Sequence, residues 1–158
     1  MHAKESLQVL CDFSRSFDIN IIVENHGGYS SNAEWLVNII KNTDRNNVGT
    51  LPDFGNFCIR SKPNKLSSWG GLDGCALEYD KYKGVKEMLP YAKSVSAKSL
   101  NFDKEGNSIE IDFYKMMKIV KTFGYNGCIS IEYEGTSHSE EEGINLTKDL
   151  MIKAWNQA

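Results

Sequence analysis

The stretch Ile19–Gly28, which reads INIIVENHGG, decides the fold because an apolar run ends abruptly in polar residues. Ile19–Val23 is rich in β-branched residues and too continuous for a strand with one wet face, which predicts a parallel strand buried on both faces. Residues 4–16 have amphipathic helical spacing before it, and Ser31 with Glu34 after it predicts a capping box that opens a second helix. Helix, strand and helix in this order are typical of an α/β protein.

The same alternation continues along the rest of the chain. Further strands are predicted over residues 48–51, 94–98 and 128–133, and further helices over residues 79–89, 111–122 and 140–155. Strands that recur at roughly 30 to 45 residues with one helix between them describe βα units and a parallel sheet. One helix followed by four such units is half of the eight in a TIM barrel. We therefore expect a single domain over residues 1–158, an α/β half-barrel.

Two features of the chain fall outside this alternation. Residues 58–77 form the longest irregular segment, which is typical of a functional lid or a disordered insertion. The four cysteines, Cys11, Cys58, Cys75 and Cys128, have no C-x-x-C spacing. That scatter favours reduced thiols over a disulfide framework or a zinc ribbon.

Composition limits the classes of partner. The chain has 158 residues, 18 of them basic and 21 acidic, for a net charge of −3, and 41% are apolar. A nucleic-acid binder normally carries a basic stripe, and the sequence has none, so we expect no nucleic-acid partner. The absence of a long apolar run and of a secretory signal pattern predicts a soluble, cytoplasmic protein with no membrane partner.

Acidic residues stand directly after three of the predicted strands. Glu24, Asp53 and Glu132 occupy these positions, and ligand sites of parallel α/β proteins lie at the carboxyl ends of the strands. Three carboxylates that converge on one mouth would repel one another without a cation, which predicts a divalent metal site. Oxygen ligands favour Mn²⁺ or Mg²⁺, and Co²⁺ or Zn²⁺ fit better if His26 joins them. The alternative is that each carboxylate only caps a helix or lies in a loop.

Four segments together suggest a family. Residues 23–28 (VENHGG), 51–57 (LPDFGNF), 94–99 (SVSAKS) and 127–135 (GCISIEYEG) resemble the last four strand ends of xylose isomerase-like TIM barrels. That superfamily includes sugar phosphate isomerases and epimerases and endonuclease IV. The resemblance implies a divalent metal held by Glu24, Asp53 and Glu132, and places Ser96 where the family has a histidine. It also places Asn56 where many relatives have a second histidine, which argues against an endonuclease.

The resemblance implies a metal-dependent sugar or sugar-phosphate isomerase or epimerase that works through an enediolate. We expect Glu24 and Glu132 to exchange a proton with a carbon next to a carbonyl, one as base and one as acid. Lys98 is expected to stabilise the enediolate or to bind a substrate hydroxyl or phosphate. Its alternative role is structural, with its ammonium paired to Glu132 or Asp53.

Other residues are candidates for binding a small carbohydrate. They are His26, Asn56, Ser96, Trp69 and Glu134. The competing explanations are a solvated loop histidine for His26, loop packing for Trp69 and simple solvent exposure for Glu134.

Three other functions remain open. A polyol dehydratase would use the same proton abstraction, and a non-catalytic half-barrel would bind a ligand without metal because Ser96 replaces a histidine. A DNA-repair nuclease is the least favoured, since it would need a basic face and more histidines.

A half-barrel leaves an apolar inner face and two strand edges open, which favours association. Either two copies complete the eight strands, another chain supplies the first half, or the chain is the C-terminal part of a longer barrel. We favour the last, with self-association as its physical result, and expect an enzyme if the barrel is completed.

Overall fold

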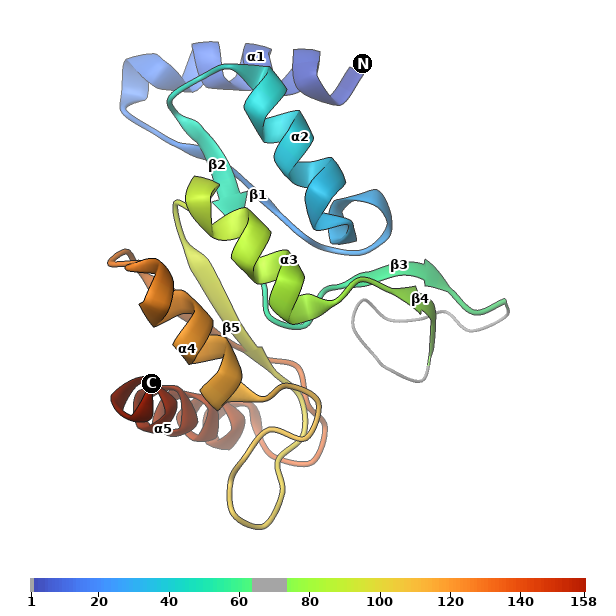
Figure 1. The fold of residues 1–158 in the computed structure, drawn as a ribbon, viewed down its shortest axis with the longest axis vertical. Coiled ribbons are helices and arrows are strands. Elements are labelled where there is room, and N and C mark those ends of the chain that lie inside the picture. The colour runs from blue at the N-terminus through green and yellow to red at the C-terminus, as the bar shows by residue number, and fades with distance from the viewer. Residues whose placement is uncertain (1, 64–73) are drawn as a thin grey trace.

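The computed structural model describes residues 2–63 and 74–158 and alternates helices with strands (Figure 1). Trp69 and the central part of the predicted irregular segment lie outside the described residues. The elements are α1 (His2–Ser14), β1 (Ile21–Glu24), α2 (Ala33–Thr43), β2 (Val48–Leu51), β3 (Cys58–Ser61), β4 (Cys75–Glu78), α3 (Lys81–Met88), β5 (Val95–Ser99), α4 (Phe113–Phe123), β6 (Ile129–Tyr133) and α5 (Glu140–Gln157). Among the described residues, no helix is both long enough and apolar enough to span a bilayer.

The strands β1, β2, β5 and β6 follow one another in a parallel array. β1 pairs with β2 and β5 pairs with β6, both in parallel. Parallel bridges from Thr50 to Ala92 and from Asp53 to Ser96 join β2 to β5. The backbone N–H of Ser96 donates to the Pro52 carbonyl at 2.9 Å across this join. Each strand therefore neighbours the next parallel one in the chain, which confirms the predicted half-barrel.

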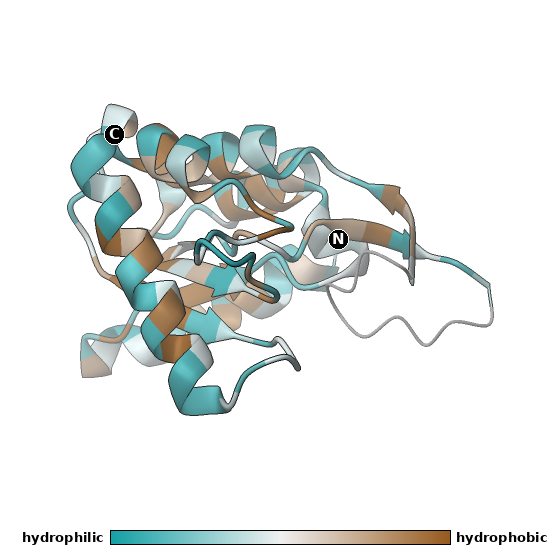
Figure 2. Ribbon diagram, turned by 90° about the horizontal axis from the view of Figure 1, so that it is seen from below, coloured by the Kyte–Doolittle hydropathy of each residue, from teal (hydrophilic) through white to brown (hydrophobic). Residues whose placement is uncertain are grey.

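The helices cover one face of the array and leave the other open. Strand alternation sends Val95 and Ala97 of β5 into the core beneath α4 and α5, while Ser96 and Lys98 point to the opposite face. A second, smaller cluster lies between β2 and the helices α1 and α2, around Cys11 and Leu36. Figure 2 shows hydrophilic and hydrophobic bands alternating along the helices, as expected when only one side of each faces a core. The open face is where the barrel axis would lie.

The prediction that Ile19–Val23 is buried on both faces is wrong. Ile22 is 42% exposed and Ile19 is 55% exposed. Ile21 and Val23 of β1 pack into the cluster with α1 and α2, so strand alternation points Ile22 to the opposite face, which the helices do not cover. The apolar run does form a parallel strand, as predicted. Burial of its inner face would need more strands than the described residues supply.

The helix boundaries are set by caps that the sequence indicated in part. The N-cap of α2 is Asn32, whose side chain accepts from the Trp35 N–H, so the capping box predicted at Ser31 is one residue too early. Gly124 ends α4 as its C-cap in the left-handed conformation, at φ 81°. Ser139 begins α5 with a complete capping box that the sequence reading missed.

The segment predicted to be irregular contains a hairpin. β3 and β4 pair in antiparallel fashion, and a disulfide joins Cys58 to Cys75. The prediction of four reduced thiols is therefore wrong for this pair, whereas Cys11 and Cys128 are free. The spacing of Cys58 and Cys75 along the chain matches no recognisable motif. Their sulfurs meet only because β3 pairs with β4, which brings together two cysteines that are 17 residues apart in the sequence.

The close approach of α3 to Phe57 gives a test of the fold. A Cβ at Gly84 would overlap the ring of Phe57, which is fully buried. We expect Gly84→Ala to lower the free energy of unfolding by about 1–3 kcal/mol despite better helix propensity, because the ring must shift in a packed core. Urea unfolding followed by circular dichroism measures this. Lys118→Ala on the exposed side of α4 is the control, and equal stability of the two variants would contradict the packing described.

Candidate metal centre

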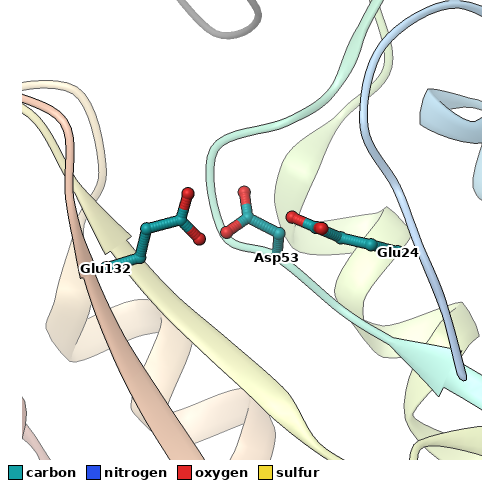
Figure 3. Close-up of side chains that lie close together, drawn as sticks. All are labelled: Glu24, Asp53 and Glu132. Atoms are coloured by element: carbon teal, nitrogen blue, oxygen red, sulfur yellow. The ribbon is translucent and has the colours of Figure 1, made fainter.

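The three predicted carboxylates converge at the carboxyl ends of the strands. Glu24 ends β1, Asp53 follows β2, and Glu132 lies in β6. One oxygen from each lies within 4.8 Å of those from the other two. Figure 3 shows the carboxylates directed toward one another. Two oxygens on opposite sides of a divalent cation lie roughly 4 to 5 Å apart, so this spacing fits one shared ion.

Asp53 is the most buried of the three and carries an unused acceptor. Its Oδ1 accepts the backbone N–H groups of Gly55 at 2.9 Å and Asn56 at 2.8 Å. Its Oδ2 is buried and has no hydrogen-bond partner among the described residues. Burial raises the pKa of Asp53 to about 7, against the opposing charge of Lys98. A buried oxygen without a donor is satisfied by a cation, so the residues present fit a metal.

Asn25 positions Asp53 and was missed by the sequence reading. Its side chain is fully buried, accepts the Asp53 N–H at 2.8 Å and donates to the Asp53 carbonyl at 3.0 Å. The amide thus binds both backbone groups of Asp53, as a neighbouring strand would. The only signal in the sequence is that Asn25 follows Glu24 at the strand end, which does not distinguish a buried amide from a loop residue.

Lys98 lies inside the cluster rather than at its rim. Its side chain is 0% exposed, and its Nζ donates to Asn56 Oδ1 at 3.0 Å and to Glu132 Oε1 at 3.2 Å, and also pairs with Glu134. Burial acts to lower the pKa of Lys98, but the hydrogen bond to Glu134 and the charges of Asp53 and Glu132 outweigh it, so the pKa lies above its ordinary value. Lys98 is a fixed positive charge beside the three carboxylates.

Ser96 holds the second oxygen of Glu132. Its hydroxyl donates to Glu132 Oε2 at 2.9 Å. Burial acts to raise the pKa of Glu132, but the hydrogen bond from Ser96 and the charge of Lys98 bring it below its ordinary value. Glu132 is therefore held in its ionised form with a donor on each oxygen.

Asn56 and His26 lie beside Glu24. Asn56 is 2% exposed, and its amide donates to Glu24 Oε1 at 3.1 Å while its own oxygen accepts from Lys98. The Nδ1 atom of His26 lies 3.2 Å from Glu24 Oε1, and this imidazole is 40% exposed. The side-chain amide of Asn56 thus links the Glu24 carboxylate to the Lys98 ammonium. The partly exposed His26 imidazole lies beside Glu24.

All the sequence-predicted site residues within the described ranges meet at this one place. Glu24, Asp53, Glu132 and Glu134 bring four carboxylates, against the single ammonium of Lys98. Such an excess of negative charge in a half-buried cluster is unfavourable unless protons or a cation compensate it. Trp69 lies outside the described residues. The arrangement can bind a divalent cation and can exchange protons with a ligand between its carboxylates.

The comparison with known families agrees with this geometry. The profile of the xylose isomerase-like TIM barrel family matches residues 1–153. The chain belongs to this family. No curated protein matches the chain significantly.

Solved structures show the same fold for this member of the family. A xylose isomerase domain protein from Planctomyces limnophilus superposes with a TM-score of 0.62 at 13% identity, over 98% of this chain and 52% of that one. D-psicose 3-epimerase from Clostridium cellulolyticum H10, solved with D-tagatose, gives a TM-score of 0.56 at 12% identity, over 97% and 53%. A D-psicose 3-epimerase solved in the presence of D-fructose gives 0.54 at 13% identity, over 98% and 52%. The chain spans about half the length of these structures, which fits the half-barrel.

The raised pKa of Asp53 predicts a pH-dependent effect of Asp53→Asn in metal-free protein. The folded carboxyl keeps its proton up to about pH 7, whereas the unfolded one loses it near pH 4, so burial of the charge costs stability as pH rises through this window. We expect Asp53→Asn to be more stable than the parent at pH 8, by on the order of 1–3 kcal/mol, and this advantage to shrink at pH 5.

Urea unfolding in EDTA at pH 5 and pH 8 measures the difference. Asp149→Asn, on the exposed side of α5, controls for the loss of one surface charge. A stability difference that stays constant between the two pH values would show that Asp53 is not the group that titrates.

Proposed function

We propose that this chain supplies the metal site of a sugar isomerase or epimerase. The observation that carries the proposal is the convergence of Glu24, Asp53 and Glu132 around one point, with a buried oxygen of Asp53 left without a donor among the described residues. In this proposal the three carboxylates hold a divalent cation. Carboxylate ligands alone favour Mn²⁺ or Mg²⁺, and Co²⁺ or Zn²⁺ become better matches if His26 turns toward the ion.

The positions of Glu24 and Glu132 suit proton transfer on a small carbonyl sugar. They come from β1 and β6, the two outer strands of the array, with Asp53 between them. A carbon bound between the two outer groups can lose a proton to the one that is a carboxylate, and can receive a different proton from the other when that one is in its carboxylic acid form. Return to the opposite face of the same carbon is epimerisation, and return to the adjacent carbon is isomerisation. A bound divalent cation would polarise the carbonyl and hydroxyl oxygens of the sugar.

Lys98 and the residues around it would complete the site. The ammonium lies close to the carboxylates, so it can offset negative charge on an enediolate oxygen. Asn56 and Ser96 are buried and already bonded to Glu24 and Glu132. In this proposal those two position the carboxylates, while the more exposed His26 contacts the sugar.

The structural relatives suggest ketohexoses as the first substrates to try. Two of them are D-psicose 3-epimerases, solved with D-tagatose or in the presence of D-fructose. The cluster needs only a carbonyl flanked by hydroxyl-bearing carbons, a feature that these sugars share.

Ser96 supports a second candidate, a non-catalytic half-barrel that binds a sugar. A serine hydroxyl is a poor replacement for imidazole as a metal ligand, and here it is already bonded to Glu132. Binding without turnover would follow if the metal is held too weakly. A polyol dehydratase would share the metal and the proton abstraction and differ only in the product.

Metal binding separates the isomerase or epimerase from the non-catalytic half-barrel. Titration of the metal-free protein with Mn²⁺, followed by calorimetry and by thermal shift, is expected to show one site. Glu24→Gln and Glu132→Gln should each weaken it more than about tenfold, because each removes a ligand charge. Glu141→Gln in the first turn of α5 is the control. No binding to the parent protein, with sugar binding retained, would favour the non-catalytic candidate.

Apolar side chains exposed around β1 lead to a proposal about association. Large apolar side chains are exposed along α1, β1 and their connection: Val9, Leu10, Phe13, Phe17, Ile19 and Ile22. β1 and β6 each have a neighbouring strand on one side only within the described residues. An exposed apolar surface beside an unpaired strand edge favours association in water. We propose that copies of the chain associate through it when no other half-barrel covers it.

Light scattering with size-exclusion chromatography tests this. The expected molar mass of the purified chain is above the 17.8 kDa of one copy. Ile22→Lys and Phe13→Lys should lower it, because a charge at either position opposes burial. Leu77→Lys is the matched control, since Leu77 is 46% exposed on the β3–β4 hairpin. A parent protein that stays monomeric at all concentrations would contradict the proposal.

A further inference from the structure

Lys98 and a metal ion would compete for the same carboxylate. The Lys98 Nζ lies 3.2 Å from Glu132 Oε1, and Glu132 is also one of the three carboxylates of the candidate metal centre. An ammonium bonded to a carboxylate opposes the approach of a cation to it, because the two positive charges repel. The site therefore contains its own competitor for the ion.

Glu134 offers Lys98 a second carboxylate, apart from the three that would share the ion. Its Oε2 pairs directly with the Lys98 Nζ, and its side chain is 40% exposed. The carboxylates that lie close enough together to share one ion are those of Glu24, Asp53 and Glu132, and Glu134 is not among them. Glu134 thus contacts the ammonium without belonging to the group that would share the ion.

We infer that Glu134 is a positioning residue that holds the Lys98 ammonium aside, so that Glu132 can turn its oxygens to the metal. The inference rests on the proposed function. It assigns to Glu134 neither a ligand role nor a contact with the sugar, the role considered from the sequence. Its effect on the metal passes through Lys98.

The hydrogen bonds of Lys98 support this positioning role for Glu134. An ammonium has three donors, and Lys98 has three acceptors, on Asn56, Glu132 and Glu134. When Glu132 turns to a metal, Asn56 and Glu134 remain, and Glu134 keeps the buried charge paired. Without Glu134, Lys98 would hold on to Glu132, because an unpaired buried charge is strongly unfavourable.

The stem of Lys98 limits where the ammonium can go. The whole Lys98 side chain is inaccessible to solvent. Escape to bulk water is therefore closed, and the ammonium can shift only among the acceptors around it. The relative strength with which Glu132 and Glu134 hold the Lys98 ammonium therefore sets the affinity of the site for a metal ion.

A double-mutant cycle with Mn²⁺ as the probe tests the inference. We expect Glu134→Gln to weaken Mn²⁺ binding about tenfold, since positioning residues around a metal have effects of this order. Lys98→Met is expected to strengthen binding. In the Lys98→Met background, Glu134→Gln should have almost no effect, because the group that Glu134 holds is gone.

A direct role of Glu134 would give a different pattern. If Glu134 bound the ion or acted only through its negative charge, Glu134→Gln would weaken Mn²⁺ binding equally in both backgrounds, and the inference would be overturned. Calorimetry of the full chain gives all four affinities, and circular dichroism confirms that each variant is folded.

A second variant keeps the test decisive if Lys98→Met does not fold. Glu134→Asp retains a carboxylate that can pair with the Lys98 ammonium, although its side chain is one methylene shorter. This variant should therefore restore most of the Mn²⁺ affinity lost in Glu134→Gln. A failure to restore it overturns the inference.

The outcomes of this experiment distinguish a failure of the inference from a failure of the proposed function. A parent protein that binds no Mn²⁺ refutes the metal site and the inference together. A parent that binds Mn²⁺, with equal effects of Glu134→Gln in both backgrounds, refutes the inference alone. Glu141→Gln again controls for the loss of a distant negative charge.

Discussion

The repulsion among acidic side chains at the open mouth of the sheet is the constraint around which this structure is arranged. Glu24, Asp53 and Glu132 meet because parallel strands end at the same edge. Burial prevents water from screening them, which raises the pKa of Asp53 to about 7. The fold tolerates the cluster because Lys98 places an ammonium beside it. In the proposed metal site, stability of the metal-free fold and affinity for the ion are therefore opposed at the same residues.

Buried amides turn this cluster into a defined geometry. Asn25 binds both backbone groups of Asp53, and Asn56 connects Glu24 to Lys98. A side-chain amide can donate and accept hydrogen bonds at the same time without adding charge. It can therefore join groups of either sign, whereas another carboxylate or ammonium would change the charge of the cluster. These contacts fix the acids while leaving the Oδ2 of Asp53 unbonded within the described part of the chain. In the proposed site this oxygen is the one left available to a cation.

The same half-barrel that gathers the acids leaves apolar surface uncovered. β5 is buried along its whole length, whereas β1 carries an exposed Ile22 on the open face. A strand inside the array has neighbours on both sides, and an outer strand has one. The relatives of known structure are about twice as long as this chain, and such length can cover that face. The carboxylate cluster itself needs only the four strands described.

The sequence by itself determined the order of helices and parallel strands and which strand ends carry acids, because hydrophobic periodicity and a polar break are local signals. It also indicated Lys98 and Ser96 as residues of one face, since strand alternation has a fixed period. Only the tertiary structure decided that Asn25 holds Asp53 across 28 residues of chain, that Lys98 reaches Asn56 across 42, and that Cys58 meets Cys75. Contacts of this kind depend on how distant segments pack, and a buried asparagine or cysteine looks the same in sequence as an exposed one.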